Sequence, residues 1–344
     1  QYYQQNPDRS YVMHWDFDVQ RQLRSNMVLS VGFMGERGIH LIADYDDIDT
    51  VIPIGVTSAG NLVFPPAGTS PKFNTHFGRI TGDIFDDQAF YDGLDVQLTQ
   101  HMSHGVSFTA AYTWEKAMDY DSSTYSQNEY TGSLGDPYPL DMFLNRGLAD
   151  YDMPQRFIFS GIWDVPTPSS FTGPVKAVLG GWELGSIITA ESGSPFSVDL
   201  TSDQAGLSSA ITNESTSAER PNFVAGCGPQ TTGSPNHYIN TSCYSFPVVG
   251  TLGNLGRNTL FGPGLAEWDF SLMRNFKISK LGEAGNLQFR GEFFNILNRA
   301  NFEIPTSKHF GIFNSKGRIN ASAGELTATA LDQREIQFAL KLMF

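Results

Sequence analysis

The chain has 344 residues and a formal net charge of −14, and 13% of its residues are aromatic while only 17% are charged. The acidic balance argues against nucleic acid as a partner, because a phosphate-binding surface has to be basic. The low charge and the many aromatic residues argue against disorder, and no apolar run reaches the roughly 18 residues of a membrane-spanning helix. Mean hydropathy is −0.24, but this average is blind to strands with one apolar and one polar face.

Alternation of apolar and polar residues is the strongest pattern in the chain. It starts at Tyr11 and recurs in nine segments, which are 11–20, 27–33, 90–99, 106–115, 156–165, 182–189, 268–278, 287–293 and 336–344. A period of two indicates a strand with two different faces. Most of these segments are longer than the average strand of about 5–6 residues and suit the roughly 9–11 residues needed to cross a bilayer. The pattern predicts an all-β, antiparallel transmembrane barrel of the outer-membrane type, and the alternative is a soluble sandwich, whose strands are shorter.

The connections between these segments alternate between short and long. Short connections lie near 23–26, 101–105, 166–178 and 280–285, and long loops cover about 37–88, 118–153, 193–265 and 299–332. Outer-membrane barrels have short periplasmic turns and long external loops, and bacterial single-chain barrels have an even number of strands. The first and the last of the nine strands would both run inward, so we expect further strands upstream. The chain is then the C-terminal part of a larger barrel.

Charged residues alternate with the apolar ones along several strands. They resemble the paired charges of an enzyme, but a watery lumen in which they pair across strands is the simpler interpretation. No nucleophile elbow, HExxH zinc motif or phosphate-binding loop occurs, so we expect neither an enzyme nor a cofactor. The residues predicted to face the lumen are His14, Asp16, Asp18, Arg156, Glu183, Asp269, Arg290 and Glu292.

Two loop features suggest local chemistry. Asp44, Asp46, Asp47 and Asp49 offer alternate oxygen ligands, as calcium loops do, but they lack the glycine and terminal glutamate of an EF-hand. They are a weak calcium candidate, and a solvated loop is the favoured interpretation. Cys227 and Cys243 share one long external loop, where an oxidising environment predicts a disulfide rather than two free thiols.

Longer sequence patterns resemble a known family. The segment GNLGRNTLFGPGLAEWDFSLMRNFKI (253–278), followed by LQFRGEFFNILNRANFEIP (287–305), is similar to the end of a TonB-dependent outer-membrane receptor. The resemblance is to Oar-like receptors with a carboxypeptidase-regulatory-like N-terminal domain, and further matches lie at 91–119, 152–166 and 181–198. It implies a barrel of about 22 strands around an N-terminal plug, which takes up a nutrient with energy passed on by TonB. No plug or TonB box is found within 1–344. The alternative function is surface binding or adhesion through the long loops.

The last strand carries a further implication of the resemblance. Outer-membrane barrels of this kind end in an aromatic residue preceded by apolar residues at alternate positions, and the barrel-assembly machinery reads them as a signal. The matching residues are Ile336, Phe338, Leu340, Leu342 and Phe344. The expected location is the outer membrane of a Gram-negative bacterium. The expected partners are outer-membrane lipid, the TonB system, the assembly machinery and an unidentified nutrient, either a small molecule or an oligomer.

Overall fold

A computed structural model shows the arrangement of the chain. It describes residues 1–45, 47–66, 69, 72–78, 80–122, 137–207, 219–278, 280, 282, 285–305 and 310–344.

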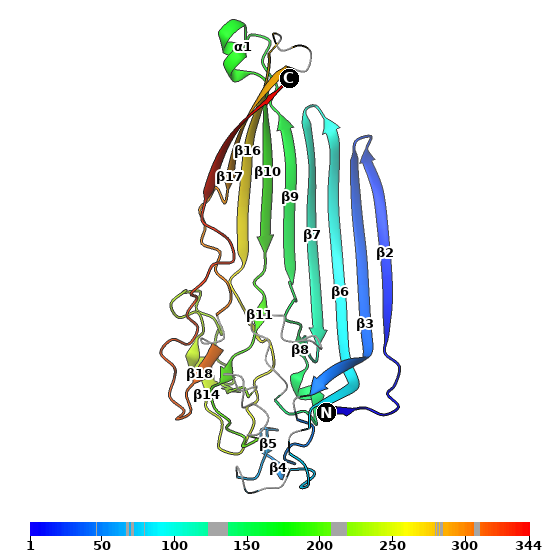
Figure 1. Ribbon diagram of the computed structural model, residues 1–344, viewed down its shortest axis with the longest axis vertical. Coiled ribbons are helices and arrows are strands. Elements are labelled where there is room, and N and C mark those ends of the chain that lie inside the picture. The colour runs from blue at the N-terminus through cyan, green and yellow to red at the C-terminus, as the bar shows by residue number, and fades with distance from the viewer. Residues whose placement is uncertain are drawn as a thin grey trace.

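The nine predicted strands form one antiparallel sheet within this described part of the chain. Their order is β19-β17-β16-β10-β9-β7-β6-β3-β2, so most neighbours in the sheet are also neighbours in sequence (Figure 1). The bounds are β2 (Tyr11–Arg24), β3 (Met27–Tyr45), β6 (Gly82–Ser103), β7 (Val106–Asp119), β9 (Gln155–Asp164), β10 (Trp182–Glu191), β16 (Leu265–Lys277), β17 (Asn286–Phe294) and β19 (Glu335–Met343). The predicted all-β antiparallel architecture is confirmed.

The remaining elements are short. Two of them, at 2–3 and 147–148, extend the same sheet by pairing with β6 and β7, the first in parallel, and the others lie beyond the two ends of the sheet. Loops with small strands gather at one end, and helix α1 (Gly173–Leu179) lies at the other (Figure 1). Among the described residues, no helix combines the length and hydropathy needed to span a bilayer. The short strands are β1 (Tyr2–Tyr3), β4 (Gly55–Val56), β5 (Leu62–Val63), β8 (Gly147–Leu148), β11 (Pro195–Phe196), β12 (Asp199–Leu200), β13 (Asn222–Phe223), β14 (Tyr244–Ser245), β15 (Leu260–Phe261) and β18 (Gly311–Phe313), and the 3-10 turns are η1 (Met142–Asn145) and η2 (Thr241–Cys243).

The strand register gathers most of the large apolar residues of the nine strands on one face of the sheet, the apolar face. Across β2, β3, β6 and β7, Phe17 lies opposite Phe33, which lies opposite Leu94, which lies opposite Trp114. Farther along the sheet, Phe270 of β16 is opposite Phe293 of β17. Because side chains alternate between faces, this register leaves the opposite face to the polar residues.

The described part of the chain leaves most of the apolar face uncovered. Phe17, Trp114 and Phe338 have 68%, 58% and 66% of their surface exposed, whereas the largest buried core consists of loop residues around Phe196 and Phe310. Large aromatic side chains are mostly buried in water-soluble proteins, and an exposed apolar area of this extent marks contact with a membrane or a partner. The burial pattern is therefore that of a sheet with lipid on one side.

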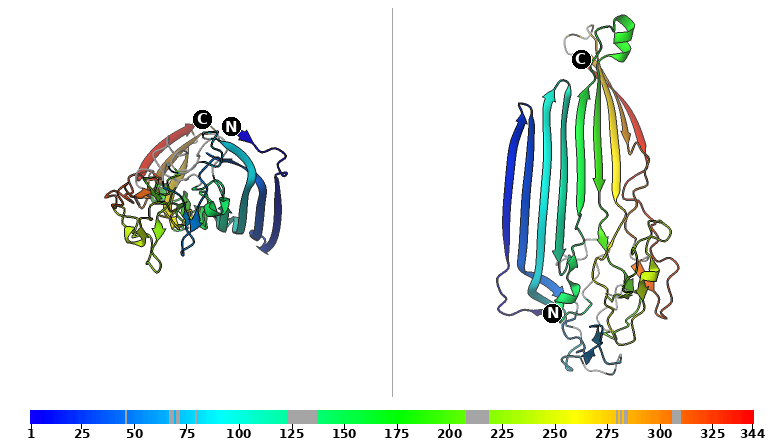
Figure 2. Two further views of the ribbon diagram at one scale, coloured as in Figure 1. Left: turned by 90° about the horizontal axis from the view of Figure 1, so that it is seen from below. Right: turned by 180° about the vertical axis from the view of Figure 1, so that it is seen from behind.

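The sheet is a curved, open wall. Seen along the strands it forms an arc (Figure 2). Its edge strands are β2 and β19, and no strand among the described residues pairs with their outer edges. The nine strands therefore do not close on themselves.

Two features differ from the sequence-based expectations. β3 continues to Tyr45 and β6 begins at Gly82, so both extend into the predicted loop 37–88. Bulges between Ile39 and Leu41 and between Leu41 and Ala43 shift the register there, which breaks the period-two pattern. Helix α1 occupies the predicted short connection 166–178, where the stretch is too short to show helical periodicity.

The two faces predict opposite responses to an added charge. Phe159 lies in the middle of β9 on the apolar face, stacked on Phe108 with ring centroids 5.9 Å apart. In the full-length protein in bilayers, Phe159→Arg should lower the free energy of unfolding by about 2–4 kcal/mol, the usual penalty for arginine near the bilayer midplane. Equilibrium denaturant titration measures this loss. The matched variant Ser160→Arg, on the polar face, should change it little, and equal losses in both variants would contradict the assignment of faces.

Candidate functional site

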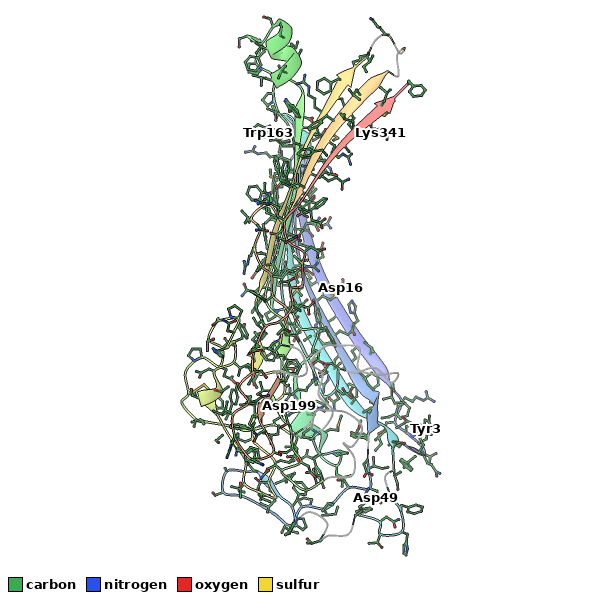
Figure 3. All side chains as sticks on the ribbon, turned by 60° about the vertical axis from the view of Figure 1, so that its left-hand side comes forward. Tyr3, Asp16, Asp49, Trp163, Asp199 and Lys341 are labelled. Carbon is green, nitrogen blue, oxygen red and sulfur yellow. A yellow bond between two sulfur atoms is a disulfide. The ribbon has the colours of Figure 1, made fainter. Side chains whose placement is uncertain are left out.

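The polar face of the sheet is the first part of the site. The register places all the residues predicted to face the lumen on this one face. They come from five strands, with His14, Asp16 and Asp18 on β2, Arg156 on β9, Glu183 on β10, Asp269 on β16, and Arg290 and Glu292 on β17. That this face lines a lumen stays a prediction. Figure 3 shows Asp16 on the wall, with Lys341 near one end and Asp49 and Asp199 among the loops at the other.

Cross-strand partners hold several of these side chains. Arg156 lies 2.7 Å from the carboxylate of Glu191 on β10, and the Ser30 hydroxyl donates to Asp18 at 2.8 Å. Asp269 accepts a hydrogen bond from the backbone N–H of Asn295, where the chain leaves β17. The face is thus a network of polar contacts, as expected for a surface in contact with water.

The loops at the outer end of the sheet form a second part, here called the loop layer. It consists of the described parts of 46–81, 120–154, 192–264 and 295–334. Its main core comprises Phe196, Val198, Leu200, Tyr238, Ile239, Cys243, Tyr244, Leu255, Leu260, Phe310, Ile312 and Phe313. The loops therefore pack on one another like a small domain.

A disulfide lies within this layer. Cys227 and Cys243 are bonded, with their Cα atoms 5.3 Å apart. The backbone N–H of Val224 also donates to the carbonyl of Cys243 at 2.9 Å. The bond therefore ties the turn 224–227 to the segment that carries the core residue Tyr244.

A buried arginine joins the loop layer to the sheet. The Arg257 side chain is 1% exposed. Its guanidinium donates to the carbonyl of Asn145 at 2.9 Å, to the hydroxyl of Ser122 at 3.0 Å, and to both the carbonyl and the carboxylate of Asp119 at the end of β7. A second carboxylate, that of Asp150, lies 3.6 Å away. Two carboxylates and three further acceptors thus surround one cation, which connects the loop 192–264 to the loop 120–154.

The next residue continues this connection. Asn258 adopts a positive φ of 54°, a conformation that asparagine tolerates better than most residues. Its amide donates to the carbonyl of Leu148 at 2.7 Å and to the carboxylate of Asp150 at 2.5 Å. Its backbone N–H donates to the hydroxyl of Ser197 at 2.8 Å. The pair Arg257–Asn258 therefore connects the loop 192–264 both to the end of β7 and to the loop 120–154.

A hollow of about 360 Å³ lies beside this junction. It is bounded by the outer parts of β3, β6 and β7, and Asp119 contributes to its wall. The remaining lining residues are Ser10, Leu41, Ile42, Phe85, Asp87, Ala89, Asp121, Ser122 and Tyr151.

A comparison with known families identifies the family of proteins to which this sheet and its loops belong. The model of a family described as outer membrane beta barrel domain matches residues 1–337. The chain belongs to this family. The barrel domain lies in the outer membrane of a Gram-negative bacterium, with its apolar face toward lipid.

Comparisons with individual proteins give a more distant relation. No curated protein matches the barrel domain. Among solved structures, it is similar to the outer membrane transporter YddB from Escherichia coli, with 10% sequence identity and a TM-score of 0.43. The similarity covers 98% of the barrel domain but 33% of the transporter chain, so the barrel domain spans about a third of that protein's length.

Two buried acids lie within the loop layer of the barrel domain. Burial raises the pKa of Asp199 to about 8, and its carboxylate oxygens accept no hydrogen bond from another described residue. Burial, together with a hydrogen bond to Asp203, also raises the pKa of Glu219 to about 8. Glu219 accepts hydrogen bonds from the backbone N–H groups of Gln204 and Ala205. Burial thus favours the protonated form of both carboxyls.

The calcium candidate takes a different form in the structure. Asp47 is fully buried, and its carboxylate accepts hydrogen bonds from the backbone N–H groups of Asp49 and Ile80 and from Lys72 at 2.5 Å. Lys72 thus supplies the positive charge that a calcium ion would bring. The interpretation as a solvated loop is wrong for Asp47 and Asp49, because both side chains are buried.

The structure describes the rest of the calcium candidate only in part. Asp49 accepts a hydrogen bond from the backbone N–H of Asn74. Asp46 and the side chain of Asp44 lie outside the described residues. Within the described part of the chain, no group of three or more His, Cys, Asp or Glu side chains could hold a metal ion.

The proposed assembly signal lies on the exposed edge strand. Ile336, Phe338, Leu340 and Leu342 alternate along β19 on the apolar face, and Phe344 follows its end. All five are at least half exposed. They are thus accessible along the strand, and recognition by the assembly machinery stays a prediction.

Sequence reasoning missed the junction at Arg257. Its residues lie within the pattern 253–278 that carries the family resemblance, but nothing in their spacing shows that an arginine in one loop meets Asp119 and Asp150 far away in the sequence. The missing information is the path of the loops in space.

Removing the buried cation should loosen the loop layer. Arg257→Met would remove the positive charge beside the buried Asp119 and Asp150 carboxylates, and breaking a buried ion pair in this way costs about 3–5 kcal/mol. We expect the loops of the folded full-length protein to become sensitive to added protease, with the barrel retained. Pulse proteolysis over a denaturant series measures the change.

The control is Arg156→Met, which removes a half-exposed arginine and should cost only about 0–1 kcal/mol. Equal protease resistance of the two variants would mean that the junction does not hold the layer.

Proposed function

We propose that the barrel domain forms part of the wall of a larger, TonB-dependent receptor of the Oar-like type, which takes up a nutrient across the outer membrane. The observation that carries this proposal is the pair of open edges at β2 and β19. In the hydrocarbon region every backbone donor and acceptor has to be satisfied within the protein, so an open sheet edge cannot face lipid. Further strands of the full-length protein would therefore complete the barrel.

The number of strands in such a barrel determines what its interior can hold. Small barrels of about eight strands fill their interior with side chains, barrels of 16–18 strands leave an aqueous channel, and barrels of 22 strands hold a plug. A wall that already has nine strands and remains open belongs to the wider classes. We propose that a plug from another part of the full-length protein fills the lumen, as the family resemblance implies.

The polar face supports passage of a hydrated cargo. Charged side chains recur on it from β2 to β17, and Arg156 and Arg290 stand among more numerous carboxylates, including Asp16, Glu183 and Asp269. A lining of this kind suits water and polar solutes rather than lipid. The proposal assigns the barrel domain binding and passage of cargo, with no catalytic step and no cofactor.

A second candidate function is surface binding or adhesion without transport. The loop layer favours it, because a core and a buried ion network give the external surface a fixed shape. Rigid loops would serve a receptor that transports equally well. The two functions differ in whether the protein engages TonB.

Binding to TonB separates them. Full-length protein in detergent should be retained on an immobilised C-terminal domain of TonB from the same organism. The matched control is the same protein without the residues that precede its barrel, which should pass through. Retention that depends on these residues supports energised uptake. Equal behaviour of both forms would contradict TonB dependence and favour adhesion.

A further inference from the structure

Helix α1 has an apolar surface that the described chain leaves uncovered. It connects β9 to β10 at the end of the sheet opposite the loop layer, close to Trp163 (Figure 3). None of its residues is buried. Val175, Val178 and Leu179 are 49%, 62% and 56% exposed, although the loops of the opposite end bury comparable residues.

Side chains from the apolar face of the sheet hold this helix. Trp182 and Arg274 lie opposite each other in the register of β10 and β16, in the same row as Phe289. The indole N–H of Trp182 donates to the carbonyl of Val178 at 3.0 Å. The guanidinium of Arg274 donates to the same carbonyl and to that of Lys176. The last turn of α1 is therefore fastened on the lipid side of the wall.

These contacts also explain how the charged side chain of Arg274 can lie on the apolar face. Arg274 is only 6% exposed, and its guanidinium lies 4.5 Å from the ring centre of Phe276 and 5.4 Å from that of Trp182. The C-terminal carbonyls of a helix carry partial negative charge and favour a nearby cation. The helix thus provides hydrogen-bond acceptors for an arginine that would find none in lipid.

The connection into β10 fixes the direction of the helix. Gly181 has a φ of +72°, and its N–H donates to the hydroxyl of Thr167 at 3.0 Å. Gly180 donates to the carbonyl of Lys176 and closes the helix. Because both sides of the connection are anchored, α1 is held in place rather than suspended in the periplasm.

We propose that α1 is an interfacial anchor, which lies in the headgroup region of the inner leaflet of the outer membrane with Val175, Val178 and Leu179 among the acyl chains. The occupant of its apolar surface is the phospholipid bilayer, because this surface continues the lipid-facing row of Trp182 and Phe289. Short amphipathic helices bind membranes in this way, and Lys176 can extend its ammonium group to the lipid phosphates. The proposal rests on the outer-membrane location and not on TonB dependence.

A fluorescent label tests the position of α1. The full-length protein carrying Val178→Cys, with its disulfide left oxidised, is labelled with bimane and placed in phosphatidylethanolamine–phosphatidylglycerol vesicles. We expect quenching by lipids brominated on their acyl chains to exceed quenching by aqueous iodide several-fold. Val175→Cys should respond in the same way. Ser169→Cys, an exposed polar position in the same connection, should show the reverse.

Each other outcome overturns the proposal. Iodide quenching at 178 and 175 equal to that at 169 would place α1 in water. Protection of 178 and 175 from both quenchers would mean that protein covers this surface. TonB binding is unaffected by either result, so failure of the anchor would leave the proposed function standing.

Discussion

In this barrel domain most of the large apolar side chains of nine strands lie on one face, and the hydrogen bonds between the strands hold them there. The constraint comes from lipid, which accepts apolar side chains but offers no partner to a backbone N–H or carbonyl. A water-soluble sheet would cover residues such as Phe17 and Phe338 with a second layer, whereas here they are exposed. Two further features follow from this constraint. The polar residues lie on the other face of the sheet, and the buried apolar core forms among the loops outside the sheet.

The loop layer is where that core forms. Its apolar residues pack around Phe196 and Phe310. A disulfide closes a turn within one loop, and a buried arginine joins segments that are distant in sequence. Arg257 matters because it meets Asp119 at the end of β7, so the layer is attached to the sheet as well as to itself. The loop layer therefore has a defined shape, which a receptor or an adhesin would require of loops that contact other molecules.

The sequence was informative where structure follows from a short-range pattern. Alternation located all nine long strands, because the two environments of the sheet impose it residue by residue. It failed in the outer parts of β3 and β6, where bulges near Leu41 break the period, and at α1, which is too short to show one. The burial of Asp47 and Asp49 was not predicted, because Lys72 and Ile80, which bind Asp47, and Asn74, which binds Asp49, become their neighbours only through folding. The junction at Arg257 was missed for the same reason.

The central claim is that one face of the wall contacts lipid and the other does not. A nitroxide scan along β9 of the full-length protein in vesicles tests it most directly, with one label at each position from 156 to 164. Collision with oxygen, which concentrates in lipid, should peak at 157, 159, 161 and 163. Collision with a water-soluble nickel complex should be lowest at those positions. Accessibility without a period of two, or with the opposite phase, would contradict the account.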